Sequence, residues 1–170
     1  MNDEKSNEAQ GTRPPNFDDL LLICRSLNEH KAEYVIIGGL AIFEHGFARM
    51  TEGIDLLVDG RPENVARVKA ALACLPDKAS LDVHDNDVLD YTVVRINDEI
   101  TVNLMGSACG VDYDQARGMI SMREIRGISI PFASPQLLWK TKQTYREKDA
   151  LDRSYLRKWF ADHGMEPPTP

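Results

Sequence analysis

Two short apolar segments separated by a glycine pair constrain the fold more than any other feature of the chain. The segment "YVII" (34–37) runs directly into Gly38 and Gly39, and a second segment, "IDLLV" (54–58), follows a polar stretch. Branched apolar runs of this length are typical of buried strands, and adjacent glycines end them in a tight turn. Between the two segments, "LAIFEHG" predicts a short helix ending at Gly46. The pattern predicts a strand–helix–strand unit.

The remaining segments extend this alternating order of helices and strands. Two antiparallel strands joined by a tight turn at Asn97-Asp98 are predicted for 88–96 and 99–105. A further strand is predicted within 125–133. Helices are predicted for 17–32, with Asn16 as N-cap, for 63–75 after Pro62, for 134–145 with Ser134 as N-cap and Pro135 in the first turn, and for 150–164.

These elements predict an α/β (α+β) fold, with a mixed sheet flanked by helices and a helical C-terminal segment. The expected organisation is a flexible lead-in at 1–16, an α/β core at 17–133, C-terminal helices packed on that core at 134–164, and a tail at 165–170. A chain of 170 residues with 42% hydrophobic residues can build one such core.

Composition also bears on the cellular compartment in which we expect the protein. No apolar run is long enough for a membrane span, and the polar N-terminus is neither a secretory signal nor a transit peptide. Cys24, Cys74 and Cys109 are far apart and show no CxxC spacing, so we expect small buried thiols in a reducing cytoplasm.

The charge distribution is uneven. A net charge of −7 argues against a surface that coats DNA non-specifically. The segment 140–158 is basic, and Lys142, Arg146 and Lys148 lie within it. These residues could meet a phosphate, or they could form a solvated helix face stabilised by pairs such as Asp149 with Arg153.

Several other polar residues have two interpretations. The acidic stretch 82–90 lacks the EF-hand glycine and glutamate, which favours a solvated loop over a calcium site. His45 could contact a nucleotide or pack at a helix end. Trp139 and Trp159 have apolar neighbours, which favours core packing.

The central motif is where chemistry is expected. Glycines between a strand and a helix allow backbone N–H groups to approach a phosphate closely, although a plain tight turn is the commoner explanation. In a strand, positions 53 and 55 project from one face, roughly 6.6 Å apart. Two carboxylates so placed can hold Mg²⁺, yet only Asp55 is acidic and its partner position is Gly53. A regular strand would point Glu52 to the opposite face, and Glu99 lies four residues before Asn103.

Two stretches of the sequence resemble a known protein family. "YVIIGGLAIFEHGFARMTEGIDLLVD" and the later "KQTYREKDALD" are similar to nucleotidyltransferases of the DNA polymerase β superfamily. The likeness is to the small bacterial AbiEii toxin-like group in particular, whose motif is a strand, a Gly-Gly or Gly-Ser pair and then Asp-x-Asp. The similarity extends over roughly 17–160. Two departures fall on the metal ligands, because Gly53 stands for the first aspartate and Asn103 for the third carboxylate.

The resemblance implies a cytoplasmic, Mg²⁺-dependent transfer of a nucleoside monophosphate from an NTP to a hydroxyl of a protein or RNA. It implies a catalytic and metal-binding role for Asp55 and a degenerate metal position at Asn103. The nucleotide-binding positions that it implies are Gly38, Gly39, Arg49, Thr51 and Lys142, and it implies that Asp149 and Asp152 anchor the helix or the edge of the active site.

Two functional hypotheses follow. In the first, the chain is an enzyme, impaired by Gly53 and Asn103, that works in a toxin–antitoxin setting with an antitoxin-like partner. In the second, it is a catalytically inactive module that binds a nucleotide or a protein partner. A membrane partner is not expected in either case.

Overall fold

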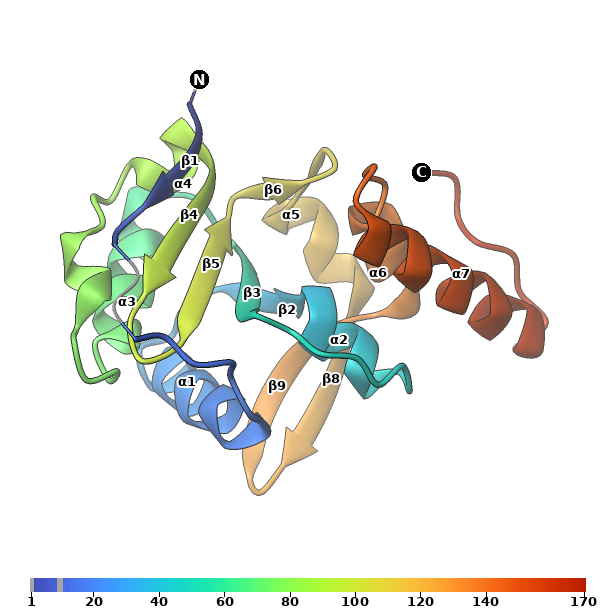
Figure 1. Cartoon of the computed structure of the whole chain (residues 1–170), viewed down its shortest axis with the longest axis horizontal. Coiled ribbons are helices and arrows are strands. Elements are labelled where there is room, and N and C mark those ends of the chain that lie inside the picture. Colours follow the sequence, from blue (N-terminus) through green and yellow to red (C-terminus); the bar gives the residue numbers. More distant parts are fainter. Residues whose placement is uncertain (1, 9–10) are drawn as a thin grey trace.

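A mixed seven-stranded sheet forms the centre of the molecule (Figure 1). The computed structural model describes residues 2–8 and 11–170. Across the sheet, parallel and antiparallel pairings alternate. The strands lie in the order β1 (Asn2–Ser6), β4 (Tyr91–Asn97), β5 (Thr101–Met105), β3 (Gly53–Val58), β2 (Tyr34–Ile37), β9 (Ile128–Ala133) and β8 (Ile120–Ile125).

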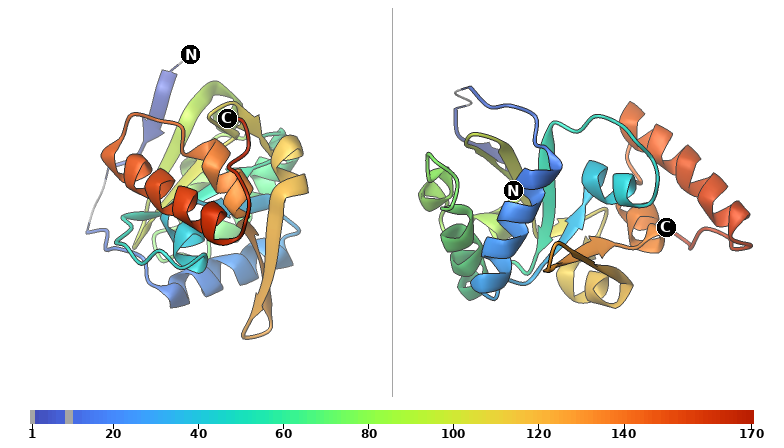
Figure 2. Two further views of the ribbon diagram at one scale, coloured as in Figure 1. Left: turned by 90° about the vertical axis from the view of Figure 1, so that its right-hand side faces the viewer. Right: turned by 90° about the horizontal axis from the view of Figure 1, so that it is seen from below.

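Helices flank this sheet, which confirms the predicted α/β class with a helical C-terminal segment. Helices α1 (Phe17–Glu29) and α3 (Pro62–Leu72) lie side by side (Figure 2), and α2 (Gly38–Glu44) connects β2 with the segment leading to β3. The C-terminal helices are α6 (Pro135–Thr141) and α7 (Glu147–Asp162). Short elements complete the chain: η1 (Ala79–Asp82), α4 (Asp87–Asp90), β6 (Ser107–Ala108), β7 (Val111–Asp112), α5 (Tyr113–Ala116) and η2 (Arg117–Met119).

Local sequence signals explain where these helices begin. The Asn16 side chain accepts a hydrogen bond from the Asp19 backbone at 3.0 Å, and the Asp19 carboxylate accepts one from the Asn16 backbone at 2.7 Å. This capping box satisfies two N–H groups that a helix start leaves unpaired. Ser134 caps α6 with a single hydrogen bond, which its side chain accepts from the Leu137 backbone at 3.2 Å, and Pro62 and Pro135 occupy first-turn positions, as the sequence predicts.

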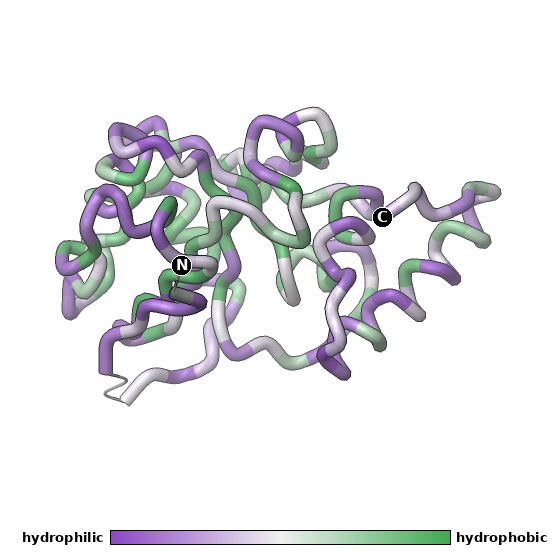
Figure 3. The backbone as a smooth tube through the Cα atoms, turned by 90° about the horizontal axis from the view of Figure 1, so that it is seen from above, coloured by the Kyte–Doolittle hydropathy of each residue, from purple (hydrophilic) through white to green (hydrophobic). Residues whose placement is uncertain are grey.

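The core lies between the sheet and its helices. Residues of β2 and β3 such as Ile36, Ile54 and Leu56 are fully buried, and Figure 3 shows hydrophobic segments concentrated toward the interior. Helix α7 joins this core through Leu156 and Phe160. Trp139 packs edge-on against Phe160, with ring centroids 6.5 Å apart, and Trp159 does so at 5.3 Å, in agreement with the packing interpretation of both tryptophans. Within the described residues, no helix combines the length and apolar character needed to cross a membrane.

The lead-in at 1–16 was predicted to be flexible, but residues 2–6 form edge strand β1, parallel to β4. Its sequence "NDEKS" has no apolar alternation. The strand is held instead by backbone pairing and by ion pairs of Glu4 with Arg95 and Lys5 with Asp87, each at 2.5 Å. A period-2 hydrophobic signal cannot reveal a strand of this kind.

The single strand predicted within 125–133 is half of a hairpin. Strand β8 precedes it, and the turn at Arg126-Gly127 has φ angles of +50° and +77°. None of the residues of β8 is buried, so its apolar pattern is weak. Two further boundaries differ, because α6 ends at Thr141 and a helical turn at 87–90 delays β4 to Tyr91.

The prediction of buried thiols holds only for Cys24. Cys74 and Cys109 are exposed, and all three cysteines are free. Cys74 lies just beyond the end of α3, and Cys109 lies between the short strands β6 and β7.

We predict that Phe132→Ala, which removes a fully buried ring from β9, lowers the free energy of unfolding by about 3–5 kcal/mol. Met122→Ala on the neighbouring strand β8 is the control, because Met122 is 59% exposed and its loss should change stability by roughly 0.5 kcal/mol or less. Urea denaturation measures both. Equal effects of the two substitutions would contradict the assignment of β9 to the core.

Candidate phosphate-binding site

A cavity of about 490 Å³ opens over one face of the sheet at β3 and β5. Strand alternation creates this face, because Thr101, Asn103 and Met105 of β5 line the cavity while Val102 and Leu104 are buried in the core. Residues 12–14, the segment leading into β3, and the C-terminal helices complete its walls. The cavity therefore combines segments distant in sequence.

The structure brings every site residue predicted from the sequence to this cavity. Its lining includes Gly38, Gly39, Arg49, Thr51, Gly53, Asp55, Asn103 and Lys142. Their catalytic, nucleotide-binding and metal-binding roles stay predictions, since shared location does not test a role.

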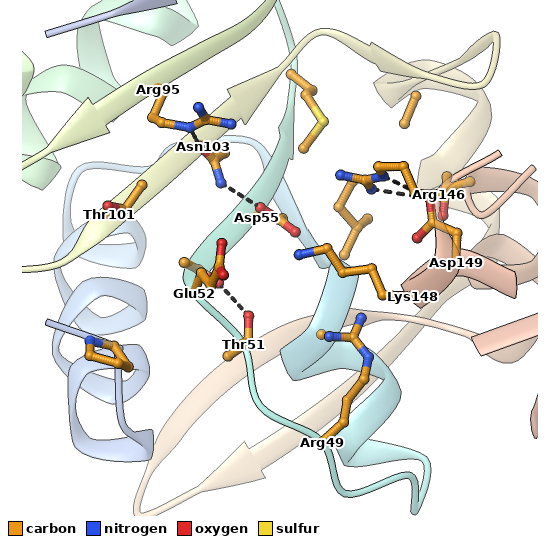
Figure 4. A pocket seen from close by; sticks show the side chains of 18 of the residues that line it. Arg49, Thr51, Glu52, Asp55, Arg95, Thr101, Asn103, Arg146, Lys148 and Asp149 are labelled. Atoms are coloured by element: carbon orange, nitrogen blue, oxygen red, sulfur yellow. Dashed lines mark hydrogen bonds and ion pairs between the residues drawn. The ribbon is translucent and has the colours of Figure 1, made fainter. Parts of the chain in front are cut away.

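Asp55 and Asn103 form the floor of the site. They face each other across the parallel β3–β5 pairing, and Asn103 Nδ2 donates a hydrogen bond to Asp55 Oδ1 at 2.8 Å (Figure 4). Arg95 Nε donates in turn to Asn103 Oδ1 at 3.2 Å. Burial raises the pKa of Asp55, and the Asn103 hydrogen bond and nearby positive charges oppose this only in part.

The glycine pair allows α2 to approach β3 closely. Gly38 has φ +73°, and a Cβ there would overlap the Asp55 carboxylate. A Cβ on Gly39 would lie 2.9 Å from Thr51 Cβ and 3.0 Å from Arg49 Nη1. Glycine is required at both positions because Asp55 and Thr51 occupy the space that a side chain would need.

Asp152 links the polar residues at the C-terminal wall. Its side chain has 0% exposure and accepts hydrogen bonds from Arg49 Nε at 2.8 Å and Nη2 at 2.7 Å, while Lys142 Nζ lies 2.7 Å from Oδ2. Burial alone would raise the pKa of Asp152, but its hydrogen bonds to Arg49 and Lys142 and their charges outweigh burial and hold this pKa below its ordinary value. Arg49 and Lys142 therefore share the buried carboxylate of Asp152.

Asp149 pairs differently from the sequence prediction. It accepts hydrogen bonds from Thr144 and Arg146, and Lys142 Nζ lies 3.6 Å away. The predicted Asp149–Arg153 pair is wrong, because Arg153 Nη1 donates to the backbone carbonyls of Lys142 and Thr144. Arg153 thus closes the loop between α6 and α7, while Asp149 faces the cavity.

A resident pair of Mg²⁺ ions does not fit these residues. The residues at 2–8 and 11–170 contain no group of three His, Cys, Asp or Glu side chains arranged to hold a metal. Asn103 directs its NH₂ group, which cannot ligate a cation, toward Asp55. Mg²⁺ requires oxygen ligands in near-octahedral geometry, and Asp55 is the sole carboxylate on the two strands of the floor, β3 and β5.

Position 53, where the family motif has its first aspartate, nevertheless lies on the predicted face of β3. A Cβ on Gly53 would lie 3.2 Å from Asn103 Nδ2, on the face that carries Asp55. It would also lie 3.0 Å from the Thr101 carbonyl oxygen, so a side chain at position 53 requires a small backbone shift.

Glu52 corrects one expectation about the carboxylates. It lines the cavity rather than facing away from Asp55, because the regular strand begins only at Gly53. Glu99 is not part of the lining and pairs with Arg13 at 3.3 Å.

Two other polar candidates have structural roles. His45 Nε2 lies 2.8 Å from the Ala133 carbonyl oxygen and is not part of the cavity lining, which favours the helix-end interpretation. In the acidic stretch, Asp87 is buried, pairs with Lys5 and accepts a hydrogen bond from the His84 backbone, so this stretch is not wholly a solvated loop.

Cationic side chains outnumber acidic ones around the cavity. Six of them, Arg13, Arg49, Arg95, Lys142, Arg146 and Lys148, line it together with the three acids Glu52, Asp55 and Asp149. Sequence reasoning missed Arg13 and Arg95. Arg95 pairs in register with Asn103, so its position could have been found from the β4–β5 hairpin register.

Comparisons with known proteins give a likeness only at the level of overall structure. No protein-family model matches the chain, and no curated protein matches it by sequence. Among solved structures, a crystal structure described as a "putative nucleotidyltransferase" from Thermotoga maritima is similar, with 20% sequence identity and a TM-score of 0.49. The similarity covers 84% of this chain and 91% of that one.

We predict that Asp152→Ala destabilises the protein by about 3–5 kcal/mol, because it leaves Arg49 without its carboxylate partner and Lys142 with only the more distant Asp149. Asp162→Ala, which removes an exposed pair with Lys158 on the same helix, should cost under about 1 kcal/mol. Denaturant unfolding of both variants at neutral pH makes the comparison. A small loss for Asp152→Ala would show that Asp152 does not anchor this wall.

We predict that Asp55→Asn stabilises the protein at neutral pH. The folded-state pKa of Asp55 is raised, so the stability that its protonated form provides is lost as pH rises from about 4 through the folded-state pKa. The variant avoids this loss. Thermal unfolding from pH 4 to 8 should therefore show a stability difference in favour of Asp55→Asn that grows with pH, whereas a constant difference would contradict the burial effect.

Proposed function

We propose that the protein is a nucleotidyltransferase-like nucleotide-binding protein whose cavity binds the phosphate chain of a nucleoside triphosphate and whose two-metal transfer activity is lost. The observation that carries this proposal is the six cationic side chains around one cavity in a chain of net charge −7. A cleft lined by cationic side chains concentrates anionic ligands even when the net charge of the protein repels them.

The resemblance of the sequence motifs to nucleotidyltransferases supports a nucleotide as the phosphate-containing ligand. The glycine pair, Arg49, Thr51, Asp55 and Lys142, which the resemblance assigns to the nucleotide site, all line the cavity. The loss of transfer follows from the ligands, since Gly53 and Asn103 leave Asp55 without carboxylate partners on its strand face.

Glu52 favours a second candidate function, weak nucleotidyl transfer. Its carboxylate lines the same cavity as Asp55, so a magnesium ion carried in on the NTP could meet both groups. In this alternative the acceptor is a hydroxyl of a protein or RNA. The cytoplasmic toxin–antitoxin setting with an antitoxin-like partner also stays a prediction.

Binding and transfer can be measured separately. Equilibrium dialysis with each of four labelled NTPs tests binding, and label incorporation into protein and RNA in the presence of Mg²⁺ tests transfer. We expect binding of at least one NTP without transfer. Arg146→Glu should weaken binding at least about tenfold, because it reverses a charge at the cavity wall.

Restoring the carboxylates tests the lost activity. The variant Gly53→Asp with Asn103→Asp should gain transfer, whereas the control Gly53→Ala with Asn103→Asp introduces the same crowding against Thr101 without the carboxylate at position 53. Transfer by the unmodified chain that Asp55→Ala and Glu52→Ala each abolish would establish the second candidate. Failure to bind any NTP would contradict both.

A further inference from the structure

Lys148 is the cavity's one cationic side chain without a carboxylate partner within 4.0 Å among the residues that the structure describes. The other five form ion pairs: Arg13 with Asp19, Arg49 and Lys142 with Asp152, Arg95 with Glu4, and Arg146 with Asp149. The charge of Lys148 is therefore available to a ligand.

The position of Lys148 is unfavourable for its own helix. It lies in the first turn of α7, a helix of 16 residues. The N-terminal end of a helix dipole is positive, so an unpaired cation there is locally destabilising. Lys148 is an exposed side chain whose charge opposes the helix dipole, and an anionic ligand in the cavity would offset that cost.

The side chain of Lys148 is directed at the floor of the site. Figure 4 shows it reaching from α7 across the cavity, with its ammonium group pointing toward the Asp55 carboxylate. The two groups are more than 4.0 Å apart, since they form no ion pair. Asp55 receives one side-chain hydrogen bond, from Asn103 to Oδ1, and its Oδ2 lies beside Gly38, where a Cβ would be 2.1 Å away.

An ammonium group in this place can perform the bridging that a metal ion performs in a phosphate site. A carboxylate repels a phosphate unless a cation lies between them. The ammonium group has three N–H donors and can direct one to Asp55 and the others to phosphate oxygens. Arg146, which is 66% exposed beside it, offers further N–H donors to the same anion.

We propose that Lys148 takes the place of the metal ion, so that this cavity binds the phosphate chain of an NTP in its magnesium-free form. The inference rests on the proposed function and specifies its ligand. A free triphosphate carries more negative charge than its Mg²⁺ complex, and the ammonium group of Lys148, which has no carboxylate partner among the described residues, can supply the counter-charge that the absent ion would supply. Mg²⁺ is then a competitor for the ligand rather than a cofactor.

Isothermal titration calorimetry with the best-bound NTP, in EDTA and in excess Mg²⁺, tests this inference. The unmodified protein should bind at least as tightly in EDTA as in Mg²⁺. Lys148→Ala should weaken binding in EDTA about tenfold and weaken binding in Mg²⁺ less, because the ion can then reach Asp55. Lys148→Arg should retain most of the EDTA affinity.

Lys158→Ala is the matched control, because Lys158 lies on the same helix, is paired with Asp162 and is not part of the cavity lining. It should bind as the unmodified protein does. Thermal unfolding should be unchanged or slightly improved by Lys148→Ala, since that side chain forms no ion pair and opposes the helix dipole. Binding that requires Mg²⁺, or that Lys148→Ala leaves unaltered in EDTA, would overturn the inference and leave the proposed function standing. Absence of binding under both conditions would overturn the proposed function itself.

Discussion

The buried carboxylate of Asp152 holds the candidate site together. It joins three separate segments of the chain. These are the segment after α2, through Arg49, the end of α6, through Lys142, and α7 itself. A carboxylate at 0% exposure is costly unless it is fully paired, and two cations meet that requirement. Because this link fixes α7 against the cavity, it also determines where Arg146 and Lys148 stand.

The floor of the site shows the opposite balance. Asp55 is held by one hydrogen bond from Asn103, and burial raises its pKa. A carboxylate kept in such an environment reduces stability, which is typical of a residue retained for a ligand rather than for the fold. The carboxylate of Asp152 in the wall is well paired. Asp55 on the floor and Lys148 at the wall, by contrast, have no ion-pair partner within the part of the chain that the structure describes.

The central elements could be predicted from the sequence because their signals are local. "YVII" and "IDLLV" are buried apolar strands, and Asn16 and Ser134 cap helices in the expected way. The edge strands β1 and β8 were missed because polar or exposed residues form them, and backbone pairing rather than side-chain burial holds them in the sheet. A pattern of hydrophobicity carries no information about such pairing.

The site shows the same division. Residues of the glycine–aspartate motif could be found from spacing, but Arg13 and Arg95 reach the cavity through tertiary contacts. Strand periodicity predicts that Glu52 faces away from Asp55. This prediction is wrong because the regular strand begins only at Gly53, one residue later. The glycine pair was predicted correctly as a strand end, yet its physical cause, the space taken by Asp55 and Thr51, emerges only from the packing.

The central claim is that the cavity above Asp55 receives the phosphate chain of a nucleotide. A crystal structure of the protein grown with a saturating NTP and no divalent cation tests this claim most directly. The account predicts phosphate oxygens within hydrogen-bond distance of Lys148 and Arg146, above the Asp55–Asn103 pair. A nucleotide bound at another surface, with this cavity holding only solvent, would contradict it.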